Sequence, residues 1–405
     1  MVSPVPPLAT LWEAVFALLL SPGCALESVR DTTSDGGAPA MASAGTDATD
    51  GNGLSAPPDE WAWLDVAGSR CGNGAPTGIA VDVRPGAQHL VVFLEGGGAC
   101  DSGQTCWVHP TADHIASGYG VTQLAADPVL GLSIFDRDDP ENPFSDASYV
   151  LVPYCTGDLH AGNGVAVYEV DGEPMVTYHY GAHNLDLYLR ALSGSFPAVD
   201  HVWLVGQSAG GFGTLFNQSF VASAFGVRTD VIDDSGPGIG VSGYPPSWSV
   251  RLPTGCQHCA VGLSPLFLHD RHTYPQTRFA FLSFQVDTVL PSFYGVSEQD
   301  VVDWLGQYER SFAQLPDTRS FVAPGAGHDV MDGTLIRATR TALSTWLGQM
   351  VMDDPGWGVG APREGRFSGE RGPCEELTSC EPARRYSMGR TLRVLARQAR
   401  AAEAE

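Results

Sequence analysis

One serine in this chain has the neighbours of an activated nucleophile. Ser208 stands in Gly206-Gln-Ser-Ala-Gly210, after an apolar run that begins at His201 and before a second apolar run. This spacing predicts a strand that ends in a sharp turn and continues as a helix, with the serine at the tip of the turn. Glycines on both sides remove side chains that would collide with the strand and the helix. The N–H of Ala209 would then lie at a helix N-terminus, where developing negative charge is favourable.

A carboxylate and an imidazole follow the serine along the chain. A serine hydroxyl needs a neutral imidazole to take its proton, and the imidazole needs a carboxylate to fix its tautomer. Asp287 and His328 each follow a strand-like segment, at residues 278–284 and 318–322. The order Ser208, Asp287, His328 is that of the α/β-hydrolases, so we predict that these three residues form a catalytic triad.

Other residues could fill two of these roles. Asp233 and Asp234 come at and directly after the end of another strand-like segment and are rival acids, while His269 and His272 are rival bases. Taken singly, Asp287 could cap a strand and His328 could be an ordinary loop residue. The order and the strand-end positions of the three residues together favour the triad.

The segments that must hold these residues alternate between strand and helix. Residues 89–94 and 147–154 are apolar runs typical of buried strands, and residues 181–195 and 333–349 have the apolar periodicity of helices. This alternation predicts an α/β-hydrolase fold with a mostly parallel central sheet and helices on both faces. Residues 241–276, rich in Pro, Gly and aromatic residues, interrupt the alternation and predict a lid-like insertion over the sheet's carboxyl edge.

Three consecutive glycines follow the strand at residues 89–94, in Glu95-Gly-Gly-Gly-Ala-Cys100. Glycine lets the backbone approach a ligand closely, so this loop is a candidate oxyanion hole that offers N–H groups to a developing negative charge. A flexible loop without a chemical role is the alternative.

Composition limits the possible partners. The chain has 405 residues, 43% of them hydrophobic, and a formal net charge of −24. The apolar share is ample for a folded core, and the charge argues against nucleic acid and anionic membrane surfaces. A polyanionic substrate would need a locally basic cleft, which the sequence does not obviously offer. We expect no cofactor, no metal, and a monomer.

The nine cysteines allow two interpretations. Setting Cys24 aside, three close pairs could be disulfides in an oxidising compartment or metal ligands in a reducing one. These pairs are Cys100/Cys106, Cys256/Cys259 and Cys374/Cys380. A zinc site would need two pairs to converge, and Cys256-Gln-His-Cys259 is the one segment that suggests it.

The N-terminus indicates export. The apolar run 11–20 has the length of a signal peptide, and Ser21-Pro-Gly-Cys24 suggests lipoprotein cleavage with a lipid on Cys24. No basic residue precedes that run, and Ser21 stands where such sites carry an aliphatic residue. We therefore expect a signal peptide (1–24), a disordered linker (25–60), a catalytic domain (61–350) and a C-terminal tail (351–405).

Several motifs together resemble the pectin acetylesterase/Notum-type carboxylesterases, and the chain is identified as a bacterial member of that family. The motifs are Leu94-Glu-Gly-Gly-Gly-Ala-Cys100, Asn142-Pro-Phe144, Val152-Pro-Tyr-Cys155, Gly206-Gln-Ser-Ala-Gly-Gly211, Asp234-Ser-Gly236 and Gly325-Ala-Gly-His328. The resemblance implies a secreted, disulfide-bonded α/β-hydrolase that cleaves O-acyl esters with the triad above. It also implies that Gly97, Gly98 and Ala209 supply oxyanion N–H groups and that Cys100, Cys106 and Cys155 are disulfide-bonded.

One position departs from the family pattern. The family usually has an aromatic residue directly before the cysteine of the glycine loop, and here that residue is Ala99. We expect a serine esterase for short, acetyl-type esters on a carbohydrate, either secreted or held at the outer membrane or cell surface. The alternatives are a non-catalytic binding protein on a hydrolase scaffold and a lipase or peptidase on the same fold.

Overall fold

The computed structural model describes residues 56–238, 243–332 and 337–358. The predicted signal peptide, Cys24, the pair Cys374/Cys380 and most of the predicted linker and tail lie outside them. Residues 56–60, the end of the predicted linker, run beside the sheet, where the N–H of Asp59 donates to the carbonyl of Val83 at 2.9 Å. No helix within the described ranges is both long enough and apolar enough to cross a membrane.

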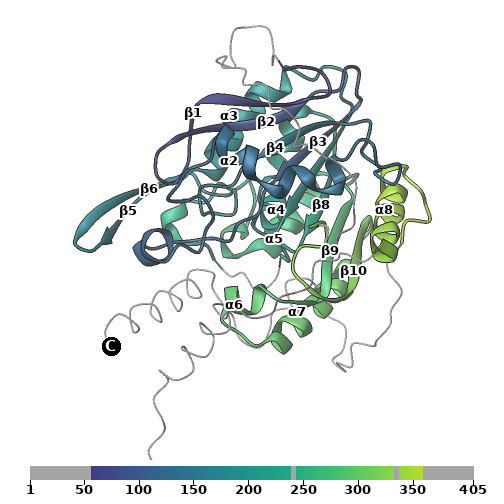
Figure 1. Ribbon diagram of the computed structural model, residues 1–405. Helices are drawn as coiled ribbons and strands as arrows, with labels where there is room; N and C mark the ends of the chain where they lie inside the picture. The colour runs from purple at the N-terminus through teal and green to yellow at the C-terminus, as the bar shows by residue number, and fades with distance from the viewer. Residues whose placement is uncertain (1–55, 239–242, 333–336, 359–405) are drawn as a thin grey trace, which may run out of the picture.

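An eight-stranded sheet runs through the centre of the molecule (Figure 1), in the order β1-β2-β4-β3-β7-β8-β9-β10. The six strands from β4 to β10 are parallel, and β1 and β2 are antiparallel to their neighbours. The bounds are β1 Trp61–Arg70, β2 Pro76–Asp82, β3 His89–Leu94, β4 Ser148–Val152, β7 His201–Gln207, β8 Arg228–Asp234, β9 Phe279–Asp287 and β10 Thr318–Gly327. The predicted mostly parallel sheet is confirmed.

Successive residues of the central strands point to opposite faces of the sheet, and both faces are buried. In β7, Val202 and Leu204 pack in one apolar cluster, while Trp203 and Val205 pack in another. Burial on both faces explains why the strands read as continuous apolar runs.

Helices cover both faces of the sheet. The helices are α2 Val121–Ala126, α3 Gly181–Ser193, α4 Ala209–Phe225, α5 Leu263–Thr273, α6 Leu290–Tyr294, α7 Glu298–Phe312 and α8 Arg337–Val351. Apolar side chains of α3, α4, α5 and α7 pack on one face, and those of α8 pack on the other. This layering is the one that the alternation of strands and helices predicts.

The described part of the predicted lid-like insertion packs into the domain and does not form a separate lid. Trp248, Leu266 and Phe267 are buried in the cluster that contains Phe216 of α4. The indole N–H of Trp248 also donates to the carbonyl of Cys100 at 2.8 Å. The aromatic residues that suggested exposed binding loops therefore bury apolar surface in the body of the domain.

A two-stranded ribbon projects from the body at the left of Figure 1 and was not expected from the sequence. It pairs β5 (Gly164–Val170) with β6 (Glu173–His179), antiparallel. Val165, Val167 and Val176 are exposed on it.

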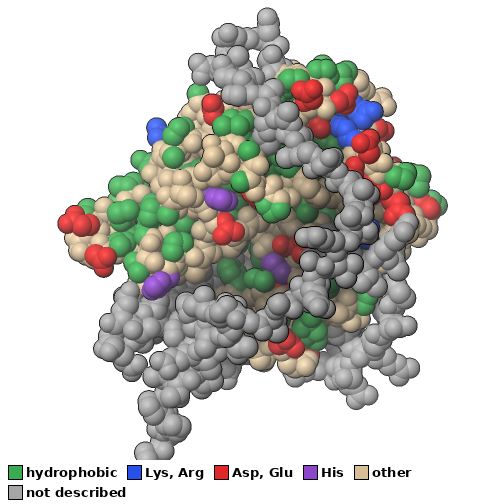
Figure 2. Space-filling model, in the orientation of Figure 1, with side chains coloured by type: hydrophobic (Ala, Val, Ile, Leu, Met, Phe, Trp, Pro, Cys, Tyr) green, Lys and Arg blue, Asp and Glu red, His purple; other side chains and the backbone are tan. Residues whose placement is uncertain are grey.

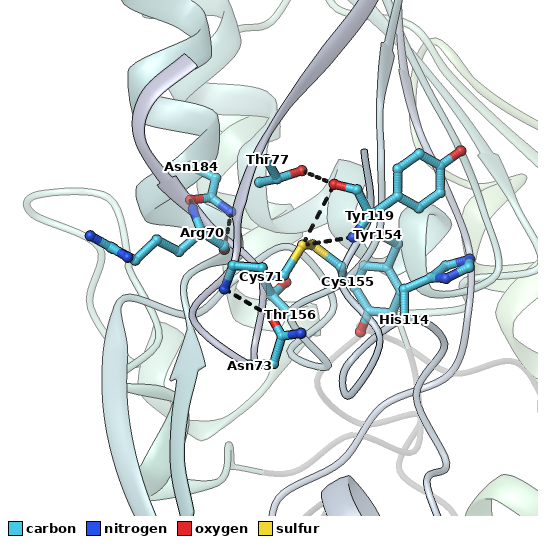
Figure 3. Close-up of a disulfide and its surroundings, with 12 residues drawn as sticks. Arg70, Cys71, Asn73, Thr77, His114, Tyr119, Tyr154, Cys155, Thr156 and Asn184 are labelled. Atoms are coloured by element: carbon cyan, nitrogen blue, oxygen red, sulfur yellow. Dashed lines mark hydrogen bonds between the residues drawn. A yellow bond between two sulfur atoms is a disulfide. The ribbon is translucent and has the colours of Figure 1, made fainter. Parts of the chain in front are cut away.

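Disulfides join three cysteine pairs: Cys71–Cys155, Cys100–Cys106 and Cys256–Cys259. Two of these are the close pairs seen in the sequence, and the first joins the end of β1 to the segment after β4. Around it, the N–H of Tyr119 donates to the sulfur of Cys71 at 3.2 Å (Figure 3). Asn184 bonds both the N–H and the carbonyl of Arg70, at 3.0 and 2.8 Å.

Replacing Cys71 and Cys155 together by alanine should lower the free energy of unfolding by about 4 kcal/mol. The bond spans 84 residues, so its loss returns considerable chain entropy to the unfolded state. Urea unfolding measures the change. The matched control removes Cys100–Cys106, which spans 6 residues and should cost less. An equal loss in both variants would contradict the chain-entropy explanation.

Candidate active site

Ser208 lies at the turn between β7 and α4 in a strained backbone conformation, with φ 51° and ψ −115°. The turn leaves no space for side chains at the flanking glycines. A Cβ on Gly206 would lie 2.1 Å from the carbonyl oxygen of Gly210, and one on Gly210 would lie 1.9 Å from that of Leu94. The sequence therefore needs glycine at both positions, and the serine hydroxyl is left half-exposed at the start of a helix.

Three side chains from three strand ends form one hydrogen-bonded line. The hydroxyl of Ser208 lies 2.7 Å from Nε2 of His328, and Nδ1 of His328 lies 2.8 Å from Oδ2 of Asp287. The sheet is parallel here, so the carboxyl ends of β7, β9 and β10 meet at one edge. The structure thus brings together the serine, histidine and aspartate that the sequence singled out.

The carboxylate of Asp287 is fully buried and fixed on both oxygens. Oδ1 accepts the N–H groups of Val289 and Leu290, each at 2.8 Å, and leaves Oδ2 for the imidazole. An ionised carboxylate can only accept hydrogen bonds, so Nδ1 of His328 carries the hydrogen and donates it to Asp287. Nε2 is then unprotonated and free to accept a proton. This tautomer is the one a general base requires.

The environment of His328 favours its protonated form. Burial alone would lower the pKa of this imidazole. The hydrogen bond to Asp287 and the negative charges of Asp329, Asp287 and Asp234 outweigh burial, so the pKa of His328 is raised. The side chain is 12% exposed, which leaves it reachable by a substrate.

The rival acids have other partners. The carboxylate of Asp234 accepts the N–H groups of Val330 and Met331, at 2.9 and 2.8 Å, and so fixes the loop that carries His328. Asp233 accepts the N–H of Gly236 at 2.9 Å. The rival bases His269 and His272 lie on α5, whereas the imidazole that bonds the hydroxyl of Ser208 is that of His328.

The glycine loop passes directly beside the serine. A Cβ on Gly96 would lie 3.1 Å from that of Ser208. Gly97 and Gly98 have φ angles of 138° and 71°, which glycine adopts most readily. Among the described residues, no backbone carbonyl accepts the N–H of Gly97, Gly98 or Ala209. The loop and the start of α4 can therefore offer these donors to an oxyanion.

Side chains from distant segments hold the carbonyl groups of this loop. The phenol of Tyr154 donates to the carbonyl of Gly98 at 2.8 Å, and Nε2 of His160 donates to that of Glu95 at 2.8 Å. Burial lowers the pKa of His160 to about 4, so its ring is neutral at pH 7. Because the carbonyls are fixed in this way, the orientation of the loop's amides is fixed as well.

Sequence reasoning did not identify these holding residues, nor the role of Glu95. Its Oε2 accepts the N–H of Tyr154 at 2.9 Å. Burial first, and then the neighbouring Asp127, raise the pKa of Glu95 well above its usual range. The one signal of this role in the sequence was the position of Glu95, an acidic residue directly after an apolar strand.

Comparisons with known proteins agree with this geometry. Residues 63–243 match the family model described as pectinacetylesterase. The chain is 30% identical over 156 residues to palmitoleoyl-protein carboxylesterase notum2 of Xenopus laevis. This alignment covers 38% of this chain and 30% of that protein. It is 28% identical over 155 residues to palmitoleoyl-protein carboxylesterase NOTUM of Homo sapiens, covering 38% and 29%. The chain is a relative of the pectinacetylesterases and Notum carboxylesterases. The resemblance inferred from the motifs is confirmed.

The alignments with the curated relatives span about a third of each relative's length. The matched family region, 63–243, includes the glycine loop and Ser208 but ends before Asp287 and His328. For these last two residues the support is their order and strand-end positions in the sequence, together with the geometry of the site.

The described residues of this pectinacetylesterase relative contain no group of three His, Cys, Asp or Glu side chains arranged to hold a metal ion. Cys256 and Cys259, which had suggested zinc, are bonded to each other.

Tyr154→Phe should lower kcat about tenfold with little change in KM. The phenol donates to Gly98 and accepts the N–H of Leu159 at 2.9 Å, so its loss frees the loop that carries the oxyanion donors. Hydrolysis of a nitrophenyl ester measures kcat, and the affinity of a boronate inhibitor should fall in parallel.

The matched control is Tyr149→Phe, on the other face of the sheet. Its phenol donates to the carbonyl of Phe144 at 2.7 Å. This variant should lose stability without losing kcat. Equal losses of kcat in both variants would contradict a specific role for Tyr154.

Proposed function

We propose that this protein is a serine carboxylesterase that hydrolyses O-acyl esters, with Ser208 as nucleophile, His328 as base and Asp287 as its orienting acid. The observation that carries the proposal is the hydrogen-bonded line from Ser208 through His328 to Asp287, with contacts of 2.7 and 2.8 Å. The relation to pectinacetylesterases and to palmitoleoyl-protein carboxylesterases supports ester hydrolysis independently.

In the proposed acylation step, the hydroxyl oxygen of Ser208 bonds to the ester carbonyl carbon and its proton moves to Nε2 of His328. The carbonyl electrons move onto the carbonyl oxygen, and the N–H groups of Gly97, Gly98 and Ala209 stabilise that oxyanion. When the oxyanion collapses, the bond to the alcohol oxygen breaks. The departing alcohol takes the proton from Nε2, and an acyl-serine remains.

Deacylation repeats the sequence with water. His328 takes a proton from the water as its oxygen bonds to the acyl carbon, and the same N–H groups stabilise the second oxyanion. Collapse breaks the bond to Ser208, which recovers its proton from Nε2. The carboxylic acid leaves, and neither step calls for a cofactor.

The substrate we propose carries a short, acetyl-type acyl group on a carbohydrate hydroxyl. The names of the relatives refer to both acetyl and palmitoleoyl esters, so the acyl length must be measured. Support for a short chain comes from the sequence, which encodes no long apolar channel. Ala99, in place of an aromatic residue, is fully buried beside Tyr154.

We also propose where the protein is located and how its chain is organised. We propose a bacterial, exported monomer with a catalytic domain at residues 61–350, a signal peptide ending near Cys24 and a tether through a lipid on that cysteine. The disulfides of the described residues support an oxidising compartment. Mass spectrometry of the mature protein tests both the cleavage site and the lipid.

A panel of nitrophenyl esters tests the activity. We expect turnover of the acetate and butyrate, little turnover of the palmitate, and labelling of Ser208 by a fluorophosphonate probe. Preference for the palmitate would favour a lipase. Absence of labelling in folded protein would favour a binding protein on a hydrolase scaffold.

A further inference from the structure

A second carboxylate lies beside the catalytic imidazole. Oδ1 of Asp329 is 3.7 Å from Nε2 of His328, the nitrogen that faces Ser208. This oxygen is buried and has no hydrogen-bond partner among the described residues. A buried, unpaired carboxylate oxygen is costly, so its position beside Nε2 requires an explanation.

The carboxylates of Asp287 and Asp329 lie next to different nitrogens of the His328 ring. Asp287 bonds Nδ1 from the end of β9, and Asp329 faces Nε2 from the loop after β10. Asp234, from the end of β8, bonds the backbone of the His328 loop but not the ring. Of the carboxylates in the described ranges that act on this imidazole, Asp329 is the one next to Nε2, the nitrogen that gains and loses a proton during turnover.

We infer that Asp329 is a second carboxylate for His328, which stabilises its imidazolium from the Nε2 side and makes the site favour esters of neutral or cationic alcohols over anionic ones. This inference rests on the proposed esterase function. The physical cause is direct: an imidazolium forms in each step, and a negative charge 3.7 Å away in a poorly hydrated site stabilises it. In proton transfer Asp329 acts through His328 and is a positioning residue, and its charge also faces the alcohol part of a bound ester.

The charged groups that face the imidazole agree with this role. Asp287, Asp329 and Asp234 all raise the pKa of His328. Burial, and next the like charge of Asp332, raise the pKa of Asp329 to about 6, against the opposing effect of His328. Tyr294 of α6 stays uncharged, because burial raises the pKa of its phenol above the usual value. Asp329 is therefore largely ionised at pH 7 to 8, where an esterase base must be neutral.

The same charge selects the alcohol part of the substrate. The leaving oxygen takes its proton from Nε2, so the alcohol is the part of the ester that comes closest to Asp329. An anionic alcohol, such as a uronate polymer, would be repelled there, whereas a neutral sugar or a cationic alcohol would not. Among the described residues visible in Figure 2, acidic side chains lie at several places on the face, and basic side chains lie towards its margins.

Asp329→Asn tests the inference, because asparagine keeps the shape of the side chain and removes its charge. The acid limb of the pH profile of kcat/KM should move to lower pH by about one unit, since the imidazolium loses a stabilising charge. The preference for acetylcholine over the neutral isostere 3,3-dimethylbutyl acetate should fall several-fold. An unchanged or raised limb, or an unchanged preference, would overturn the inference.

The control is Asp332→Asn, which removes an equal charge from an exposed residue four positions beyond His328. It should move the limb much less than Asp329→Asn does. Equal shifts would mean that net charge alone acts on the site, which would also overturn the inference.

A measurement without turnover separates this inference from the proposed function. The imidazole of His328 is titrated by NMR, its signal assigned by its loss in His328→Gln. Its pKa should be lower in Asp329→Asn than in the unchanged protein. If no ester is hydrolysed but this shift appears, the esterase proposal fails while the electrostatic role of Asp329 stands. If esters are hydrolysed and the shift is absent, the reverse holds.

Discussion

Ser208→Ala should lower kcat for a nitrophenyl ester by about 10⁵- to 10⁶-fold. The reason lies in the geometry: the hydroxyl 2.7 Å from Nε2 of His328 is the group placed to form the acyl intermediate. Without it, His328 and the N–H groups of the glycine loop can act only on water. A residual rate above that of the uncatalysed reaction is then expected from the oxyanion donors.

The fold should survive this change, which makes the result easy to interpret. The backbone strain at Ser208 comes from the turn and not from the hydroxyl, and alanine adds no atom to the site. The unfolding midpoint should stay within a degree or two of the original. Ser235→Ala is the matched control, because its side chain is buried and its hydroxyl donates to the carbonyl of His328. If Ser208→Ala kept more than 1% of the activity, the nucleophile would have to be another residue.

The sequence predicted the fold class and the serine turn because both follow from local patterns. Apolar runs separated by helical periods specify a parallel sheet covered on both faces. The turn around Ser208 depends in part on contacts within a few residues, such as the approach of Gly206 to Gly210. Short-range requirements of this kind can be predicted from a sequence.

The sequence favoured Asp287 as the acid by chain order, but it left Asp233 and Asp234 as rivals. Asp234 and Asp287 both end strands of the same parallel sheet, so both reach its carboxyl edge. What separates them is the direction of the side chain. Asp287 turns towards the ring of His328, and Asp234 turns towards the backbone of Val330 and Met331.

The residues that hold the glycine loop were missed for a related reason. Tyr154 and Gly98 are 56 positions apart, and His160 and Glu95 are 65 apart. No periodicity or motif links residues over such distances. The same holds for Cys71–Cys155, which is separated by 84 residues and was not among the close pairs that the sequence suggested.

Asp287→Asn should lower kcat about 10⁴-fold while leaving the fold intact, and the local hydrogen bonds explain why. Oδ1 of Asp287 accepts the N–H groups of Val289 and Leu290. In the variant, only the amide oxygen can accept these bonds, so the amide NH₂ must face Nδ1 of His328. That contact favours the tautomer with the proton on Nε2, which cannot accept a proton from Ser208.

The matched variant is Asp234→Asn, which tests the rival acid. Its two carboxylate oxygens accept the N–H groups of Val330 and Met331, and asparagine can keep only one of these bonds. We expect the free energy of unfolding to fall by about 1 to 3 kcal/mol and kcat to fall no more than about tenfold. Kinetics and urea unfolding of both variants decide between the two aspartates. If a folded Asp234→Asn lost more kcat than Asp287→Asn, Asp234 would be the residue that orients the imidazole. The orientation of His328 would then depend more on the position of its loop, which Asp234 holds, than on the hydrogen bond at Nδ1.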